Sequence, residues 1–217
     1  YRGMDRKVHK AKGYDRYTVF SLWDTFRALH PLLTIIDRER TTDFIRSFLS
    51  IYDECGKLPI WELAGNETNC MIGYHSVPVI ADALVKGVGG FDANAALDAM
   101  VASSRKAEFG IDVYINNGLV LAEKEHESVS KTLEYAVDDW CIAQVAKLLG
   151  RDDLYNEYIR RAKYYRNIYD PSTGFMRPRI NGIWLTPFDP NEVNVHYTEA
   201  NSWQYTFHVP QDVSGLM

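Results

Sequence analysis

The chain has 217 residues, of which 46% are hydrophobic and 24% are charged. This is the composition of a globular protein with one sizeable core, and it excludes a disordered chain. The formal net charge is −5 with mixed signs, so no basic face is offered to nucleic acid. No apolar run reaches the roughly 18 residues that a membrane span requires. We therefore expect partners that are small or neutral molecules.

Apolar residues recur at helical spacing along most of the chain, which predicts an all-α fold. Helices are expected near residues 19–36, 42–54, 70–86, 92–105, 128–149 and 152–167. The clearest apolar stripe runs from Val137 to Leu148 and stops before Gly150. Only Gly150-Arg151-Asp152 connects this helix to the next one. Because the connection is so short, we expect the last two helices to form an antiparallel hairpin. Six helices in hairpin pairs would form most of a toroid.

Polar stretches with frequent glycine and proline separate the expected helices. They cover residues 57–68, 114–126 and 170–198. Loops on a rigid scaffold are where functional sites usually lie. The third stretch should carry a short β-hairpin, because Asn181-Gly182 is a favoured two-residue turn between strands.

The three cysteines and the chain ends give two further expectations. Cys55, Cys70 and Cys141 are odd in number and widely spaced, which fits neither a zinc motif nor a disulfide framework. We expect them to be buried thiols. The sequence opens at Tyr1 without an initiator methionine or signal-peptide pattern and closes at Met217 without an obvious tail. We expect a segment of a longer polypeptide, with part of any site outside it.

The run 197–205 places one carboxylate, Glu199, among aromatic and amide side chains. Aromatic faces stack on sugar rings, amides bridge neighbouring hydroxyl groups, and a carboxyl group buried among them can become a proton donor. Glu199 is therefore the leading catalytic candidate. Asn201, Trp203 and Gln204 are the expected site-lining residues around it.

Glu199 also has a structural interpretation, as a helix cap or as the ion-pair partner of Arg177 or Arg179. Other chemistries lack their motifs. No histidine pair has zinc-ligand spacing, no Gly-x-Ser-x-Gly elbow is present, and no glycine-rich phosphate loop appears. Zinc hydrolysis, serine hydrolysis and nucleotide chemistry are thus disfavoured.

Two earlier segments also combine tryptophan with carboxylates. Asp24 follows Trp23 in an expected helix, where a buried carboxylate would accept two sugar hydroxyls; the alternative is an exposed aspartate beside a core tryptophan. Glu67 lies in a Gly-Asn-Glu-Thr-Asn turn, and its alternative role is a first-turn acid that favours the dipole of the following helix. Trp23, Asp24 and Glu67 are candidate substrate-binding residues.

Several motifs, taken together, resemble glycoside hydrolase family 92. They are residues 2–6, 21–25, 27–31, 65–69, 170–179 and 199–205. The last, Glu-x-Asn-x-Trp-Gln-Tyr, is quite specific. The resemblance implies an exo-acting, inverting, calcium-dependent α-mannosidase, often α-1,2-specific, that acts on mannose-containing oligosaccharides or N-glycans. It further implies an (α/α)6 toroid preceded by a β-sandwich, and a periplasmic, cell-surface or secreted location.

The resemblance also assigns roles to particular residues. Glu199 matches the general acid, Trp23 and Asp24 match a segment that contacts the terminal mannose, and Asn201 and Gln204 match site-lining residues. The family's elements that supply the calcium ligands and the catalytic base would follow the last residue given. The resemblance assigns no metal ligand within this chain, which would hold the acid without its base.

Two other kinds of function stay open at this point. A carbohydrate-binding or inactive scaffold module would use the same aromatic and amide side chains. An (α/α)6 glycosidase of another specificity, such as a glucosidase or a trehalase-like enzyme, would share the fold, because a fold does not fix the substrate. In either enzymatic interpretation, residues 1–217 are one part of the (α/α)6 catalytic domain, with short β-hairpin insertions.

Overall fold

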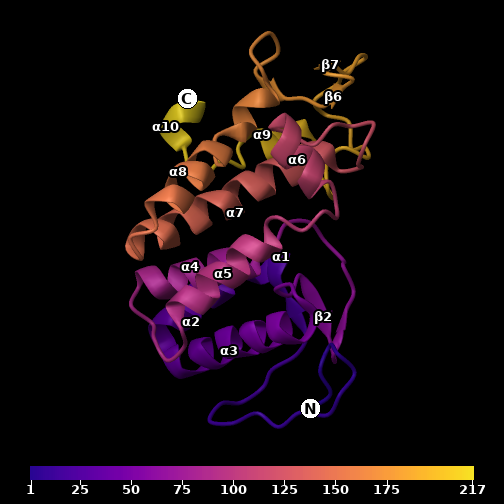
Figure 1. Ribbon diagram of the computed structural model, residues 1–217. Coiled ribbons are helices and arrows are strands. Elements are labelled where there is room, and N and C mark those ends of the chain that lie inside the picture. The colour runs from indigo at the N-terminus through magenta and orange to yellow at the C-terminus, as the bar shows by residue number, and fades with distance from the viewer. The chain divides into compact units, whose positions relative to one another are not determined.

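The computed structural model describes residues 1–217 as ten α-helices with short strands, and its fold divides into two compact units (Figure 1). The first unit comprises Tyr1–Ser104 with Cys141–Tyr155, and the second comprises Arg105–Trp140 with Asn156–Met217. Helices α7 (Ser128–Leu148) and α8 (Asp152–Arg161) each contribute residues to both units. The expectation of a mainly helical chain is confirmed.

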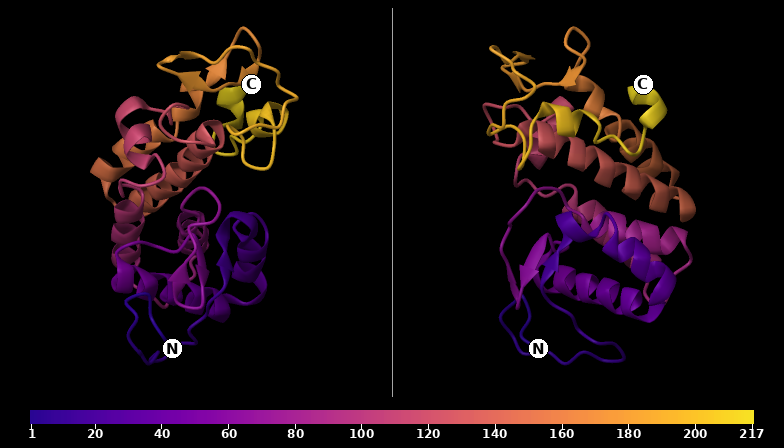
Figure 2. Two further views of the ribbon diagram at one scale, coloured as in Figure 1. Left: turned by 90° about the vertical axis from the view of Figure 1, so that its right-hand side faces the viewer. Right: turned by 180° about the vertical axis from the view of Figure 1, so that it is seen from behind.

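The first unit is built on a layer of packed helices (Figures 1 and 2). They are α1 (Leu22–Thr25), α2 (Leu29–Ile36), α3 (Arg38–Cys55), α4 (Ser76–Val85) and α5 (Ala93–Ser103). Helices α2, α3 and α4 contact one another, and α5 packs on α3 and α4. The apolar face of α3 is fully buried at Ile45, Phe48 and Ile51. This periodic face is what made α3 predictable from sequence.

Capping side chains set the ends of these helices. The Asp37 carboxylate accepts a hydrogen bond from the Arg40 amide at 3.1 Å and starts α3, four residues earlier than the predicted helix. Gly56, with φ of 77°, ends it in the left-handed conformation. The Asp92 carboxylate caps α5 in the same way as Asp37 caps α3.

The single helix predicted near residues 19–36 is wrong in its first part. Residues Phe20–Ser21 form strand β1, and β1 pairs with β2 (Trp61–Leu63), which pairs with β3 (Asn66–Glu67) in an antiparallel sheet. The register pairs Phe20 with Glu62 and Glu62 with Glu67. This pairing holds the chain extended until α1 begins at Leu22, so tertiary contacts override the local helical pattern.

The second unit is centred on the first part of α7. Its other helical elements are α6 (Ile111–Asn117), the second part of α8, a 3₁₀ turn (Tyr164–Asn167), α9 (Ser202–Thr206) and α10 (Val213–Leu216). A buried ion pair joins α8 to α7, with Arg161 Nε 2.8 Å from Asp139 Oδ2. The hydroxyl group of Tyr114 on α6 donates to the same oxygen at 3.0 Å. One carboxylate therefore ties three helices together.

Two small hairpins complete the second unit. Strands β6 (Arg179–Ile180) and β7 (Ile183–Trp184) pair through Asn181 and Gly182, whose φ angles are 50° and 80°. The predicted two-residue turn is thus confirmed. Strand β5 (Phe175–Met176), expected in the same hairpin, instead pairs with β4 (Tyr169–Asp170).

Two other expectations are answered by burial and helix length. The cysteines form no disulfide, but only Cys141 is fully buried; Cys55 is half-buried and Cys70 is exposed in the loop after β3. The prediction of three buried thiols is therefore wrong for Cys70. None of the helices combines the length and the apolar character that crossing a membrane requires.

Candidate functional site

Glu199 is an exposed residue in an otherwise buried segment of the second unit, just before α9. Its backbone φ is 51°, in the left-handed region that residues other than glycine seldom adopt. No hydrogen bond or ion pair of the chain engages its carboxyl group. Such backbone strain clusters at functional sites. The carboxyl group is therefore presented to solvent by a backbone that its neighbours must hold in place.

Neither structural interpretation of Glu199 matches the contacts seen. Arg177 Nη1 forms an ion pair with Asp170 Oδ2 at 2.9 Å, and Arg177 also donates to the Leu185 carbonyl. The Arg179 guanidinium lies 4.0 Å from the centroid of the Trp184 ring. Both arginines thus have other partners within the hairpin region.

The cap of α9 is Asn201, not Glu199. Asn201 and Gln204 form a capping box. Asn201 Oδ1 accepts from the main-chain N–H of Gln204 at 3.2 Å, and Gln204 Oε1 accepts from the main-chain N–H of Asn201 at 3.0 Å. Asn201 Nδ2 also donates to the Asn191 carbonyl at 3.2 Å. The Asn-x-x-Gln spacing carried this signal, and sequence reasoning missed it. The two amides fix the chain directly after Glu199.

The aromatic residues of this run divide into core and surface. Tyr197 is 3% exposed and donates to the Met176 carbonyl at 2.8 Å, and burial raises its pKa to about 12. Tyr205 is also buried. Trp203 is 49% exposed and meets Phe175 edge to face at 4.6 Å between ring centroids. Trp203 is therefore the ring of this run that can stack on a ligand. The expected burial of Glu199 among these rings is not seen in this chain.

In the first unit, Trp23 and Asp24 lie on the short helix α1. Asp24 is exposed and accepts a hydrogen bond from the Ser21 hydroxyl. Trp23 is half-buried, and the Arg27 guanidinium lies 5.3 Å from the centroid of its ring. Asp24 is thus an exposed carboxylate beside a partly accessible indole, rather than beside a core tryptophan.

Glu67 is held by main-chain amides. Its Oε1 accepts from the amides of Trp61 and Asn69, both at 2.9 Å, and its Oε2 accepts from the Ile60 amide at 2.8 Å. It lies on β3, and the next helix begins only at Ser76, so the interpretation as a first-turn helix acid is wrong. These three bonds give the Glu67 carboxylate a structural role in shaping the sheet.

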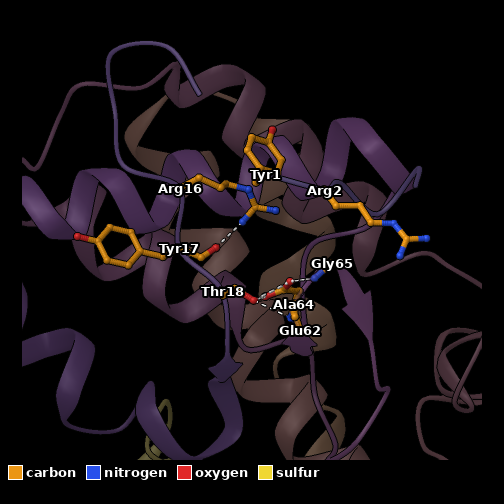
Figure 3. Close-up of a pocket in the computed structure, with 8 residues that line it drawn as sticks. All are labelled: Tyr1, Arg2, Arg16, Tyr17, Thr18, Glu62, Ala64 and Gly65. Carbon is orange, nitrogen blue, oxygen red and sulfur yellow. Dashed lines mark hydrogen bonds between the residues drawn. The ribbon is translucent and has the colours of Figure 1, made fainter. Parts of the chain in front are cut away.

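The first unit also contains a pocket of about 230 Å³ at its N-terminal end (Figure 3). Its lining residues include Tyr1, Arg16, Thr18 and Glu62, and none of the predicted site residues. Glu62 is 1% exposed, and its carboxylate accepts from Thr18 Oγ1 at 2.8 Å and from the Gly65 amide at 2.6 Å. Sequence reasoning did not single out Glu62, which secures the loop that precedes β1.

The acidic, histidine and cysteine side chains do not gather into a metal site. No group of three or more His, Cys, Asp or Glu side chains in residues 1–217 is arranged to hold one. Calcium takes roughly six to eight oxygen ligands. The Glu67 oxygens accept from main-chain amides, and the Glu127 carboxylate, which is bonded to the residue before Glu199, accepts from Thr198 Oγ1. The residues present therefore do not form a calcium site by themselves.

The predicted site residues fall in both units. The first unit holds Trp23, Asp24 and Glu67, and the second holds Glu199, Asn201, Trp203 and Gln204. In the first unit, the antiparallel sheet links Glu67 to the strand that leads into α1. In the second unit, Glu199 and the capping box lie within one short loop and helix.

The chain as a whole is similar to known proteins. Residues 1–217 match the family described as "Glycosyl hydrolase family 92 catalytic domain". The family GH92 α-mannosidase BT3965 from Bacteroides thetaiotaomicron is 48% identical with a TM-score of 0.97, over 100% of this chain and 30% of that one. Its complex with mannoimidazole gives 46% identity and the same TM-score and coverage.

Two further proteins are similar. The GH92 inverting mannosidase BT2199 from the same organism is 38% identical with a TM-score of 0.90, over 99% of this chain and 30% of that one. A protein of Arthroderma benhamiae named as an uncharacterized secreted glycosidase is 24% identical in an alignment 221 residues long, and the match covers 83% of this chain and 28% of that protein. The chain therefore spans less than a third of each of these proteins.

Proposed function

The chain belongs to glycosyl hydrolase family 92, and we propose that the full-length protein containing it is an exo-acting α-mannosidase. It releases terminal α-linked mannose, with α-1,2 linkages preferred, from mannose-containing oligosaccharides or N-glycans. The observation that carries this proposal is the family match along the whole chain. The likeness to a solved α-mannosidase that binds mannoimidazole supports it.

In the proposed reaction Glu199 is the general acid. Inverting hydrolysis uses two carboxyl groups roughly 6.5–9.5 Å apart, one that protonates the leaving oxygen and one that activates water on the opposite sugar face. The Glu199 proton passes to the glycosidic oxygen as the bond to the anomeric carbon breaks. Its carboxyl group has no partner in the chain and is therefore accessible to a substrate, which supports contact with the glycosidic oxygen. The catalytic base comes from outside these 217 residues.

Three of the other predicted residues bind the sugar. Trp203 offers the half-exposed indole face on which a pyranose ring stacks. Asp24 offers a carboxylate at the surface for sugar hydroxyls, beside the indole of Trp23. The remaining predicted residues are Glu67, Asn201 and Gln204. Their side chains are bonded to main-chain groups, so they contribute by holding the backbone of the proposed site.

The proposal extends to the architecture around the chain. Residues 1–217 form one part of an (α/α)6 toroid, which a following segment completes and a β-sandwich precedes. Calcium is bound through oxygen ligands from the following segment. The enzyme works in a periplasm, at a cell surface or in the medium, as the name of the Arthroderma benhamiae relative favours.

The test is mannose release by the full-length protein from α-1,2-, α-1,3- and α-1,6-linked mannobiose, with a calcium chelator and with calcium added back. We expect release that is fastest on the α-1,2 linkage, lost with the chelator and restored by calcium. Proton NMR during turnover should show β-mannose as the first product, because the mechanism inverts the anomeric centre. Mannose binding without release from any linkage would contradict the proposal and favour a carbohydrate-binding module.

A further inference from the structure

The backbone immediately before Glu199 is tied to the start of α7. The Thr198 amide donates to Ser130 Oγ at 2.8 Å, and Thr198 Oγ1 donates to Glu127 Oε1 at 2.9 Å. Thr198 is 5% exposed and Ser130 is fully buried. Both hydrogen-bond donors of the residue next to Glu199 are therefore taken up by two residues of one helix start.

Glu127 is itself held from two sides. Its amide donates to the Val195 carbonyl at 2.7 Å, and its φ of 56° is also left-handed. Its Oε2 lies 3.6 Å from the ammonium group of Lys131, which is 4% exposed and donates to Glu125 Oε1 at 2.9 Å. The buried ammonium group needs these carboxylates, and they in turn are oriented by it.

These bonds and the capping box hold the backbone on both sides of Glu199. The bonds to Glu127 and Ser130 fix the chain at Thr198, and the capping box fixes it again at Asn201. A left-handed residue persists only where its surroundings determine the backbone from both directions. The side chain of Glu199 is then aimed by its neighbours rather than by any bond of its own carboxyl group.

We propose that Glu127 and Thr198 are positioning residues for the general acid: the Glu127 carboxylate, oriented by Lys131, holds the Thr198 hydroxyl and thereby fixes the direction of the Glu199 side chain. This inference rests on the proposed function, because it assigns the residues an effect on proton donation. Neither residue has to touch the substrate.

The test compares two substrates in the full-length enzyme. Hydrolysis of α-1,2-mannobiose needs protonation of a poor leaving group, whereas a dinitrophenyl α-mannoside departs without it. A misplaced acid therefore slows the first substrate selectively, while a general loss of structure slows both. The paired variants are Thr198→Val, which deletes the hydroxyl at constant shape, and Thr198→Ser, which keeps it. Glu127→Gln is compared with Glu123→Gln, an exposed glutamate of the same loop.

We expect Thr198→Val and Glu127→Gln to lower kcat on mannobiose by about 10- to 100-fold, the loss that a displacement of about 1 Å produces. The rate on the aryl mannoside and KM should change little, and Thr198→Ser and Glu123→Gln should stay near wild type. Equal losses on both substrates, or a Thr198→Ser enzyme as slow as Thr198→Val, would overturn the inference. If Glu127→Gln does not fold, the Thr198 pair decides alone.

Glu199→Gln separates this inference from the proposed function. If Glu199→Gln loses mannobiose hydrolysis selectively but Thr198→Val does not, the acid assignment stands and the positioning role fails. If Glu199→Gln keeps full activity on mannobiose, the acid assignment itself fails.

Discussion

His30 provides a stability prediction that can be worked from the structure. It lies on α2 at 3% exposure, edge to face with Phe44 at 5.5 Å and Phe48 at 6.3 Å between ring centroids. Its Nδ1 atom is buried without a hydrogen-bond partner. Burial among these rings lowers the pKa of His30 from 6.5 to about 4, because the charged imidazolium is poorly solvated there.

The direction in which stability changes with pH depends on whether the folded or the unfolded chain binds the proton more readily. Below pH 6.5 the unfolded chain protonates this histidine, whereas the folded chain does so only near pH 4. Stability is therefore complete above pH 6.5 and is lost as the pH falls toward 4. At about 1.4 kcal/mol per pH unit, the loss across this window is about 3 kcal/mol.

The assay compares wild type with His30→Leu and with His126→Gln, which alters an exposed histidine. Hydrogen exchange of peptides from α2, followed by mass spectrometry between pH 7.5 and 4, reports the free energy of opening of this helix. Between pH 6.5 and 4 the free energy of opening of α2 should fall by about 3 kcal/mol more in wild type than in His30→Leu. The His126→Gln variant should behave like wild type. Parallel curves for wild type and His30→Leu would refute the reasoning.

Three further substitutions test the fold. Arg161→Met leaves the buried Asp139 carboxylate without its cation, so it should lower the free energy of unfolding by about 3–5 kcal/mol in urea titrations. The double variant Arg161→Met with Asp139→Asn should recover part of that loss. An Arg161→Met variant as stable as wild type would contradict the ion-pair account. Asn201→Ala removes the capping box and should cost about 1 kcal/mol, seen as faster hydrogen exchange in α9; unchanged exchange would argue against the cap. Gly182→Ala adds a Cβ atom with no neighbour within 4 Å, but the backbone at this position has a φ of 80°. Backbone strain alone should therefore lower the free energy of unfolding by about 1–2 kcal/mol. An unchanged thermal midpoint would count against this reasoning.

Sequence reasoning succeeded where one periodic face decides the structure. The stripes of α3 and α7 and the Asn181-Gly182 turn are local signals, and all three elements are found. It failed at Phe20, where pairing with β2 keeps the chain extended, and it missed α6, a helix of seven residues inside an expected loop. Neither feature is visible in a local pattern.

The candidate site shows the same division. The motif resemblance singled out Glu199, but its left-handed backbone and its exposure are properties of the folded chain. The bond from Thr198 to Glu127 joins residues 71 positions apart, and no local pattern reports it. The capping role of Asn201 and Gln204 was readable from their spacing, and it accounts for two amides that were predicted to line the site.

The central claim is that Glu199 is the general acid of an α-mannosidase, and one measurement tests it most directly. Wild type and Glu199→Gln of the full-length enzyme are compared on α-1,2-mannobiose and on a dinitrophenyl α-mannoside. We expect the variant to lose roughly 100-fold or more of its activity on mannobiose, the range of general acid catalysis, while it still hydrolyses the aryl mannoside. Wild-type turnover of mannobiose by Glu199→Gln would contradict the claim.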